Sequence, residues 1–269
     1  MTAPDPVPDA MTRDEITTVI ANLRRSWDQF HEGDLDLSVP RDATNISVTA
    51  CVLGLASHVT ALADTVVTVL DHTTNELVAM PLVRQAFECA ITAHWIAQVP
   101  DGMQAFASEH TRKRTALVAD LRRARSETFR TGADKVAAHV LPELPSKSSG
   151  PARNFNQMCD DLALAGVDAY VYYRLASEQS HPSVFVADQY LESADKDGIV
   201  LLTVPRATVA DAGWLFLTAA SVVWAQMAVN YCDPERRRRN ELRAVARKLQ
   251  IKAELTLSDA AWKRLNAGQ

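Results

Sequence analysis

The segment that most restricts the fold is the apolar run from 212 to 232, which contains no charged side chain. A run of this length either spans a bilayer or forms the central buried helix of a helical bundle. The basic flank Arg236–Arg239 fits the positive-inside rule. The polar residues within the run favour the bundle instead: Thr218, Ser221, Gln226 and Asn230. We therefore expect a buried core helix, with membrane insertion as the alternative.

The composition favours helices throughout the chain. Of 269 residues, 47% are hydrophobic and 23% are charged, which excludes a mostly disordered chain, a collagen-like chain and a short disulfide scaffold. Glycine is scarce, with 9 residues. We predict an all-α fold, a bundle of about seven or eight helices in one domain over 12–269. A disordered tail is expected at 1–11, and at most a short β element near 198–204.

Periodicity and capping signals place the expected helices. Thr12 and Glu15 form a capping box that begins a helix running to about Phe30, followed by a loop at 33–41. A second helix over 43–71 carries one apolar stripe, made of Val52, Leu55, Val59, Leu62, Val66 and Val69. Further helices are expected at 74–98 (with Pro81 as a kink or a restart), 103–130, 134–140, 154–165, 168–180, 208–231, 234–250 and 258–265.

Charge is divided unevenly along the chain. Residues 1–110 hold 5 Lys and Arg against 15 Asp and Glu, whereas the remainder holds 23 basic and 18 acidic residues. Most of the positive charge lies in two stretches, 112–130 and 236–252. Such stretches bind nucleic acid or an acidic partner in some proteins, and in others they are solvated helix faces.

Other site classes lack a sequence signal. The four cysteines are far apart in sequence and sit among apolar neighbours, as buried free thiols do: Cys51, Cys89, Cys159 and Cys232. The histidines show no metal-site spacing, and there is no glycine-rich phosphate loop, no Gly-x-Ser-x-Gly elbow and no DNA-binding motif. We expect no metal and no cofactor. Residues 1–11 lack the apolar core of a signal peptide, so a cytoplasmic location is the default expectation.

Two constellations carry potential chemistry. Arg84 and Glu88 are four residues apart on an otherwise apolar helix, which predicts either a structural ion pair or a pocket with an anchoring arginine. Arg174 and His181 are seven residues apart, close to two helical turns, with Ser177 and Glu178 between them. These two groups suit metal-independent RNA cleavage. The imidazole would act as general acid or base, and the guanidinium would stabilise the charge on the phosphate. Alternatively, His181 caps the end of its helix.

The segments PLVRQAFECAITAHWIAQ (81–98) and YYRLASEQSHPS (172–183) resemble a bacterial family of helical proteins known only as a domain of unknown function. Its members carry an Arg-x-x-x-Glu helix with a following Trp, matched by Arg84, Glu88 and Trp95. A later Tyr-x-x-Leu-Ser-like helix ending in His is matched by Tyr173, Ser177 and His181. The resemblance spans about residues 45–232.

The Arg174-x6-His181 element is also similar to the signature of the HEPN superfamily. That resemblance implies a helical, often dimeric ribonuclease of toxin or antiviral type, with Arg174 and His181 as the catalytic pair. Leu175 departs from the pattern, which has a polar residue there, and Pro182 ends the helix at the histidine. Because inactive HEPN-like domains act as binding or assembly modules, this second role stays open.

The sequence thus supports three hypotheses. In the first, a dimeric ribonuclease cleaves RNA at Arg174 and His181, and the basic helices bind phosphate. In the second, a non-catalytic module binds a protein or a small molecule through Arg84, Glu88, Trp95 and Tyr173. In the third, the protein attaches to a membrane through 212–232.

Overall fold

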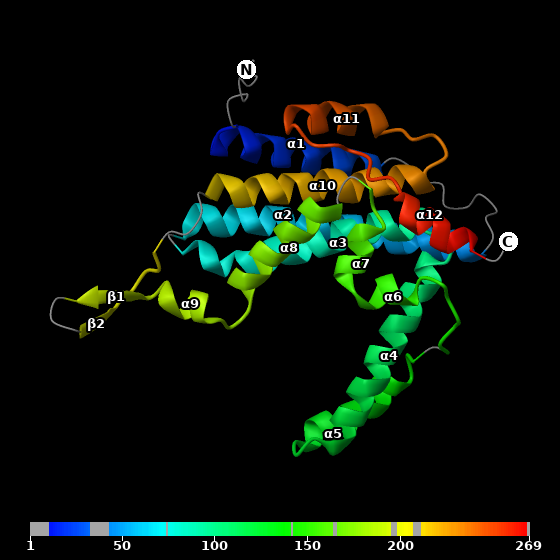
Figure 1. Cartoon of the computed structure of the whole chain (residues 1–269), viewed down its shortest axis with the longest axis horizontal. Helices are drawn as coiled ribbons and strands as arrows, with labels where there is room; N and C mark the ends of the chain where they lie inside the picture. The colour runs from blue at the N-terminus through cyan, green and yellow to red at the C-terminus, as the bar shows by residue number, and fades with distance from the viewer. Residues whose placement is uncertain are drawn as a thin grey trace.

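The uncharged run folds as the central helix of the molecule. In the computed structural model, α10 (Asp211–Cys232) packs against α1 (Arg13–Glu32), α2 (Ala43–His72) and α3 (Met80–Gln98) (Figure 1). The structure describes residues 11–32, 43–73, 75–140, 142–163, 166–194, 198–206 and 211–267. Over these residues the fold is all-α apart from one small sheet, which confirms the predicted fold class.

The remaining elements surround this core. In chain order they are η1 (Glu76–Val78), α4 (Gly102–Arg123), α5 (Glu127–Ala137), α6 (Ser149–Arg153), α7 (Phe155–Asp160), α8 (Gly166–Ser180), α9 (Val184–Asp188), α11 (Arg239–Lys248) and α12 (Asp259–Asn266). Strand β1 (Leu191–Ala194) pairs antiparallel with β2 (Gly198–Leu201), with Leu191 opposite Leu201. Figure 1 shows two projections from the bundle: the α4–α5 pair, and α9 with the sheet.

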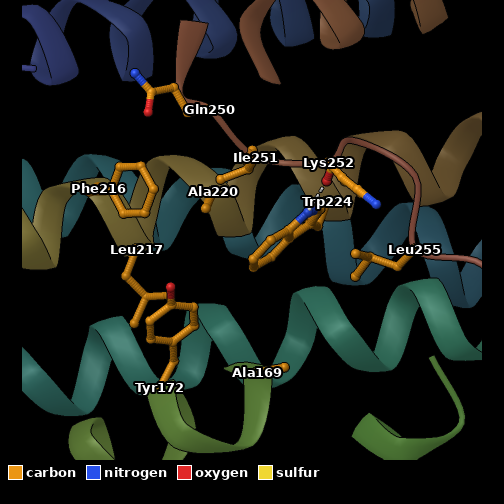
Figure 2. A pocket seen from close by; sticks show the side chains of 10 residues that line it. All are labelled: Ala169, Tyr172, Phe216, Leu217, Ala220, Trp224, Gln250, Ile251, Lys252 and Leu255. Carbon is orange, nitrogen blue, oxygen red and sulfur yellow. Dashed lines mark hydrogen bonds between the residues drawn. The ribbon is translucent and has the colours of Figure 1, made fainter. Parts of the chain in front are cut away.

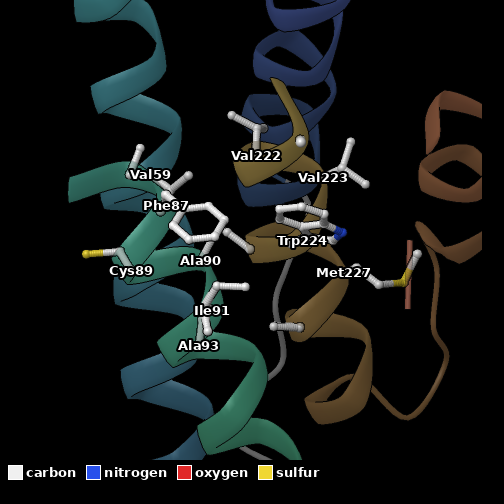
Figure 3. Close-up of a cluster of buried hydrophobic side chains, with 14 of the residues drawn as sticks. Val59, Phe87, Cys89, Ala90, Ile91, Ala93, Val222, Val223, Trp224 and Met227 are labelled. Carbon is white, nitrogen blue, oxygen red and sulfur yellow. The ribbon is translucent and has the colours of Figure 1, made fainter. Parts of the chain in front are cut away.

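Aromatic and branched side chains fill the space between α3 and α10. Figure 3 shows the Phe87 ring facing the Trp224 indole, and their ring centroids are 6.1 Å apart. Ile91 from α3 and Val223 from α10 are both fully buried in the same cluster. Burying side chains of this size contributes about 1.5–3 kcal/mol each to folding. This packing fixes the axis of α3, on which Arg84 and Glu88 stand.

The polar residues of α10 are hydrogen-bonded inside the bundle. Thr218 and Ser221 donate to the carbonyls one turn back, at 2.8 and 2.7 Å. Gln226 donates to the Thr60 hydroxyl of α2 at 3.1 Å, and Asn230 donates to the Gln226 carbonyl at 3.3 Å. Buried polar groups need such partners, so these side chains fit a core helix of a bundle.

Two of the described helices are long and apolar enough, by length and composition, to cross a membrane. They are Ile46–His72 within α2 and Ala212–Cys232 within α10. In α10, 83% of the most apolar window is buried inside the bundle, against 33% in α2. Burial in the core therefore accounts for the apolar character of α10, as the bundle interpretation of the sequence expected.

The expected helix at 103–130 is wrong in its last seven residues, where the chain turns and starts a second helix. α4 ends at Arg123, Ala124 is extended, and Ser126 begins α5, which packs back along α4. The guanidinium of Arg130 donates to the carbonyls of Ala124 and Arg125, both at 2.8 Å. These bonds satisfy carbonyl groups that a continuous helix would have paired internally.

Other boundaries shift by smaller amounts. Pro81 stands in the first turn of α3, so it marks a restart and not a kink. β2 lies within the predicted 198–204 region, whereas β1 has no sequence signal because its residues show no alternating apolar pattern. The predicted loop at 33–41 and most of the predicted tail at 1–11 lie outside the described residues.

Candidate functional site

Arg84 is the centre of a cluster that joins four of the eight predicted site residues. It stands on the exposed edge of α3, and its side chain is 18% exposed. The guanidinium donates to Glu88 Oε1 one turn later, from Nη2 at 2.8 Å and from Nε at 3.2 Å. The i, i+4 pair predicted from the sequence is therefore present, and it fixes the plane of the guanidinium.

His181 reaches the same guanidinium from a distant part of the chain. Its Nε2 lies within hydrogen-bonding distance of Arg84 Nη1. Because a guanidinium only donates, Nε2 is the acceptor, and its single lone pair is engaged by Arg84 in this contact. α8 ends at Ser180, and the His181 amide bonds to the Ser177 carbonyl at 3.1 Å, so the His-Pro step ends the helix as predicted. The imidazole is exposed to solvent at the helix end.

Tyr173 completes the cluster from the middle of α8. Arg84 Nη2 donates to its hydroxyl at 3.2 Å, and the guanidinium carbon lies 5.1 Å from the ring centroid. The Tyr173 ring packs against Phe155 at 4.7 Å between centroids and stacks on Tyr170 at 5.8 Å. Aromatic neighbours on both sides hold the phenol in place, so Arg84 is fixed by side chains from two helices.

Arg174, Ser177 and Glu178 line a separate open groove of about 620 Å³ on the outer face of α8. Arg174 is exposed and forms no hydrogen bond or ion pair with any residue that the structure describes. The Ser177 hydroxyl is buried and has no partner among these residues. No hydrogen bond or ion pair joins Arg174 to His181 in the described chain, and the histidine pairs with Arg84 instead.

Trp95 lies elsewhere, in the core of the bundle. It is fully buried, and its Nε1 donates to Asp161 Oδ2 at 2.8 Å. Arg264 of α12 pairs with the same carboxylate, from Nη2 at 2.7 Å. The structure therefore does not bring Trp95 to the Arg84 cluster: the residue anchors α12 to α3.

The two basic stretches are largely paired with acidic side chains. In 112–130, Arg112 donates to the buried carboxylate of Glu109 at 2.7 and 2.8 Å, and these bonds hold the pKa of Glu109 below its ordinary value. In 236–252, Arg239 and Arg243 share Glu254. Burial by itself would raise the pKa of Glu254, but these hydrogen bonds bring it below its usual value. Both stretches therefore present less free positive charge than their sequences suggest.

Thiol and metal chemistry have little support in the described residues. Cys89 and Cys159 are buried, and burial raises the pKa of both thiols, that of Cys159 to about 12. A thiol in this state is a poor nucleophile. Cys51 and Cys232 are half-buried. No group of three or more His, Cys, Asp or Glu side chains in the described part of the chain has a geometry that holds a metal ion.

One site was missed by sequence reasoning. A cavity with aromatic and polar lining residues lies between α8, α10 and the segment 250–255 that follows α11. Its aromatic residues, Tyr172, Phe216 and Trp224, were read from the sequence only as helix and core positions. The segment 250–255 has no periodic pattern, and so nothing in the sequence indicated that it closes over α10.

The profile of a family of unknown function (DUF5677) matches residues 49–199, a span that contains Arg84, Glu88, Tyr173 and His181. No curated protein matches the chain, and no solved structure matches it. The match and the helical fold confirm the predicted resemblance to an all-helical family of unknown function. The resemblance to the HEPN superfamily stays a prediction.

Proposed function

The chain belongs to this family of unknown function, and from the geometry of its own site we propose that it is a metal-independent ribonuclease. The observation that carries the proposal is the contact between Arg84 and His181, which are 97 positions apart. The contact brings an imidazole nitrogen next to a fixed guanidinium at the surface. In phosphodiester cleavage an imidazole can act as the general base, and a guanidinium can stabilise the negative charge on the phosphate. In this proposal Arg84 takes the role that the HEPN resemblance implies for Arg174.

In this mechanism the scissile phosphate binds to Arg84 and displaces the imidazole from the guanidinium. His181 Nε2 then takes the proton of the adjacent 2′-hydroxyl, and the 2′ oxygen attacks phosphorus as the bond to the 5′ oxygen breaks. The 5′ oxygen takes a proton from solvent, and His181 returns its proton to solvent. The products are a 2′,3′-cyclic phosphate and a 5′-hydroxyl. Arg84 stabilises the extra negative charge on the phosphate oxygens in the transition state.

Neighbouring residues have supporting roles in the proposal. Glu88 and Tyr173 position the guanidinium by the hydrogen bonds described above. Arg174, exposed in the groove on the same helix as Tyr173, binds a flanking phosphate. A dimer that pairs two such sites, as in HEPN-like enzymes, and a cytoplasmic location belong to the same proposal.

The test is cleavage of a 5′-labelled RNA by the purified protein with chelator present throughout. We expect products that end in a 2′,3′-cyclic phosphate, and a loss of about 10²–10⁴-fold in rate for His181→Ala, the usual contribution of a general acid or base. His139→Ala is the matched control, because it removes another exposed histidine at the end of α5. Equal rates for His181→Ala and the wild type would refute the assignment.

A non-catalytic binding module is the second candidate. It is favoured by the fact that three side chains already engage the Arg84 guanidinium, as in a structural ion pair. In that case the folded wild type leaves RNA intact. Arg84→Ala then lowers the stability of the protein by about 1 kcal/mol, because the partly buried acceptors Glu88 and Tyr173 lose their donor.

A further inference from the structure

The cavity between α8, α10 and the segment 250–255 has a volume of about 240 Å³. Its floor is apolar and almost fully buried, formed by Leu217, Ala220 and Trp224 of α10. Figure 2 shows the Phe216 and Tyr172 rings on one side of the space and the Trp224 indole on the other. This volume is slightly below the range of about 300–1,000 Å³ that is usual for drug-sized ligands, which suits a ligand of one or two rings.

The wall residues favour a flat apolar guest. The Trp224 Nε1 donates to the Lys252 carbonyl at 2.8 Å, so the indole N–H is already used and only its ring is left to contact a ligand. This hydrogen bond also holds the segment 250–255 against α10. Concave sites lined by aromatic rings with few polar groups are the usual form of small-molecule sites. Rings prefer to pack against rings in offset or edge-to-face arrangements, which adds selectivity for planar molecules.

Two of the lining residues carry exposed polar side chains. Gln250 and Lys252 are exposed, and neither side chain has a hydrogen bond or ion pair with a residue that the structure describes. The nearby carboxylate of Glu254 is engaged by Arg239 and Arg243. Lys252 is the one charged residue among the described residues that line the cavity, and its ammonium favours a ligand with an anionic group.

The backbone conformation of Gln250 independently supports a function of its side chain in ligand binding. Gln250 has φ 55°, and the Ile251 amide bonds to the Ala246 carbonyl at 2.9 Å, which is the Schellman ending of a helix. Glycine is the usual residue at this position, because a side chain costs about 1 kcal/mol in a left-handed conformation. Here a glutamine occupies it, and its side chain lines the cavity. Strained residues of this kind cluster at ligand sites.

We infer that this cavity binds a small planar aromatic molecule that carries an anionic group. The rings of Phe216, Tyr172 and Trp224 would enclose the aromatic part, and Lys252 would pair with the anion. The inference is independent of the proposed ribonuclease activity, since none of the residues of the Arg84 cluster lines this cavity.

The test is isothermal titration of the full chain with 2-naphthoate and with the neutral 2-naphthalenemethanol. We expect saturable one-site binding of naphthoate. Lys252→Gln should weaken it by up to about fivefold, the upper range for an exposed ion pair, and should leave the binding of the alcohol unchanged. Lys263→Gln is the matched control, because it removes an exposed lysine of α12 that does not line the cavity.

A second variant tests the location. Ala220→Met places a flexible apolar side chain in the floor of the cavity and should abolish binding while the helical circular dichroism is kept. Three results would overturn the inference: no saturable binding by the wild type, binding that survives in folded Ala220→Met, or equal effects of Lys252→Gln on the acid and on the alcohol.

Discussion

The carboxylate of Asp161 ties α12 to the core, and its removal is expected to destabilise the protein strongly. Its side chain is 5% exposed and accepts from the Trp95 indole at 2.8 Å and from Arg264 at 2.7 Å. Asp161→Ala leaves the N–H of the fully buried Trp95 without an acceptor, which costs about 1–3 kcal/mol. Breaking a buried ion pair costs about 3–5 kcal/mol of stability. Because Arg264 is 30% exposed, water can solvate its guanidinium once the carboxylate is removed, and we expect a cost at the lower end of this range.

We therefore expect Asp161→Ala to lower the free energy of unfolding by about 3 kcal/mol, measured by urea denaturation followed by circular dichroism. In a chain of this size that is a fall in Tm of about 6–12 °C. Asp161→Asn keeps an acceptor for the indole and loses only the charge, so its effect should be smaller. The control is Asp160→Ala, an exposed neighbour expected to change stability by less than about 0.5 kcal/mol. Equal losses for Asp161→Ala and Asp160→Ala would refute the reasoning.

Two further predictions concern buried and strained groups. Burial lowers the pKa of His94 from 6.5 to about 4, so the folded state resists its protonation and stability is lost as the pH falls from about 6.5 towards 4. The free energy of unfolding, measured by urea denaturation, should fall between pH 7.5 and pH 4.5 in both proteins, and the fall should be about 2–3 kcal/mol larger in the wild type than in His94→Gln. An equal fall in the two proteins would contradict this. Gln250→Gly should raise the stability by up to about 1 kcal/mol through relief of the left-handed residue, while it weakens naphthoate binding. A Gln250→Gly protein that is no more stable would show that the residue is not strained.

Sequence periodicity predicted the long helices because each of them buries a continuous apolar stripe. Val52, Val59 and Val66 lie at the expected spacing on α2, and all three are fully buried. The capping box was also correct: the Thr12 amide donates to Glu15 at 2.9 Å, and the Glu15 amide donates to the Thr12 hydroxyl at 3.3 Å. The break between α4 and α5 was missed because Ala124 and Arg125 favour helix locally, and the reversal depends on tertiary contacts.

The candidate site was predictable only where its members are close in sequence. Arg84 and Glu88 are one turn apart, so their pairing followed from helix geometry. The contact of Arg84 with His181 depends on how α8 packs on α3, and one sequence carries no record of such a long-range contact. The seven-residue spacing of Arg174 and His181 predicts that they share one helix face, but α8 ends at Ser180 and the histidine turns towards Arg84.

The central position of α10 has a consequence for how the chain acquires its structure during synthesis. α2 and α3 precede α10 by more than 100 residues, yet the apolar faces of all three are buried against one another. A ribosome-bound chain that has emerged only to about residue 200 therefore cannot bury the inner faces of α2 and α3, and it exposes surface that chaperones bind. The segment matched by the family, residues 49–199, ends before α10 begins. In this protein that segment lacks the helix that fills its own core, so we expect it to be insoluble when produced without residues 211–232.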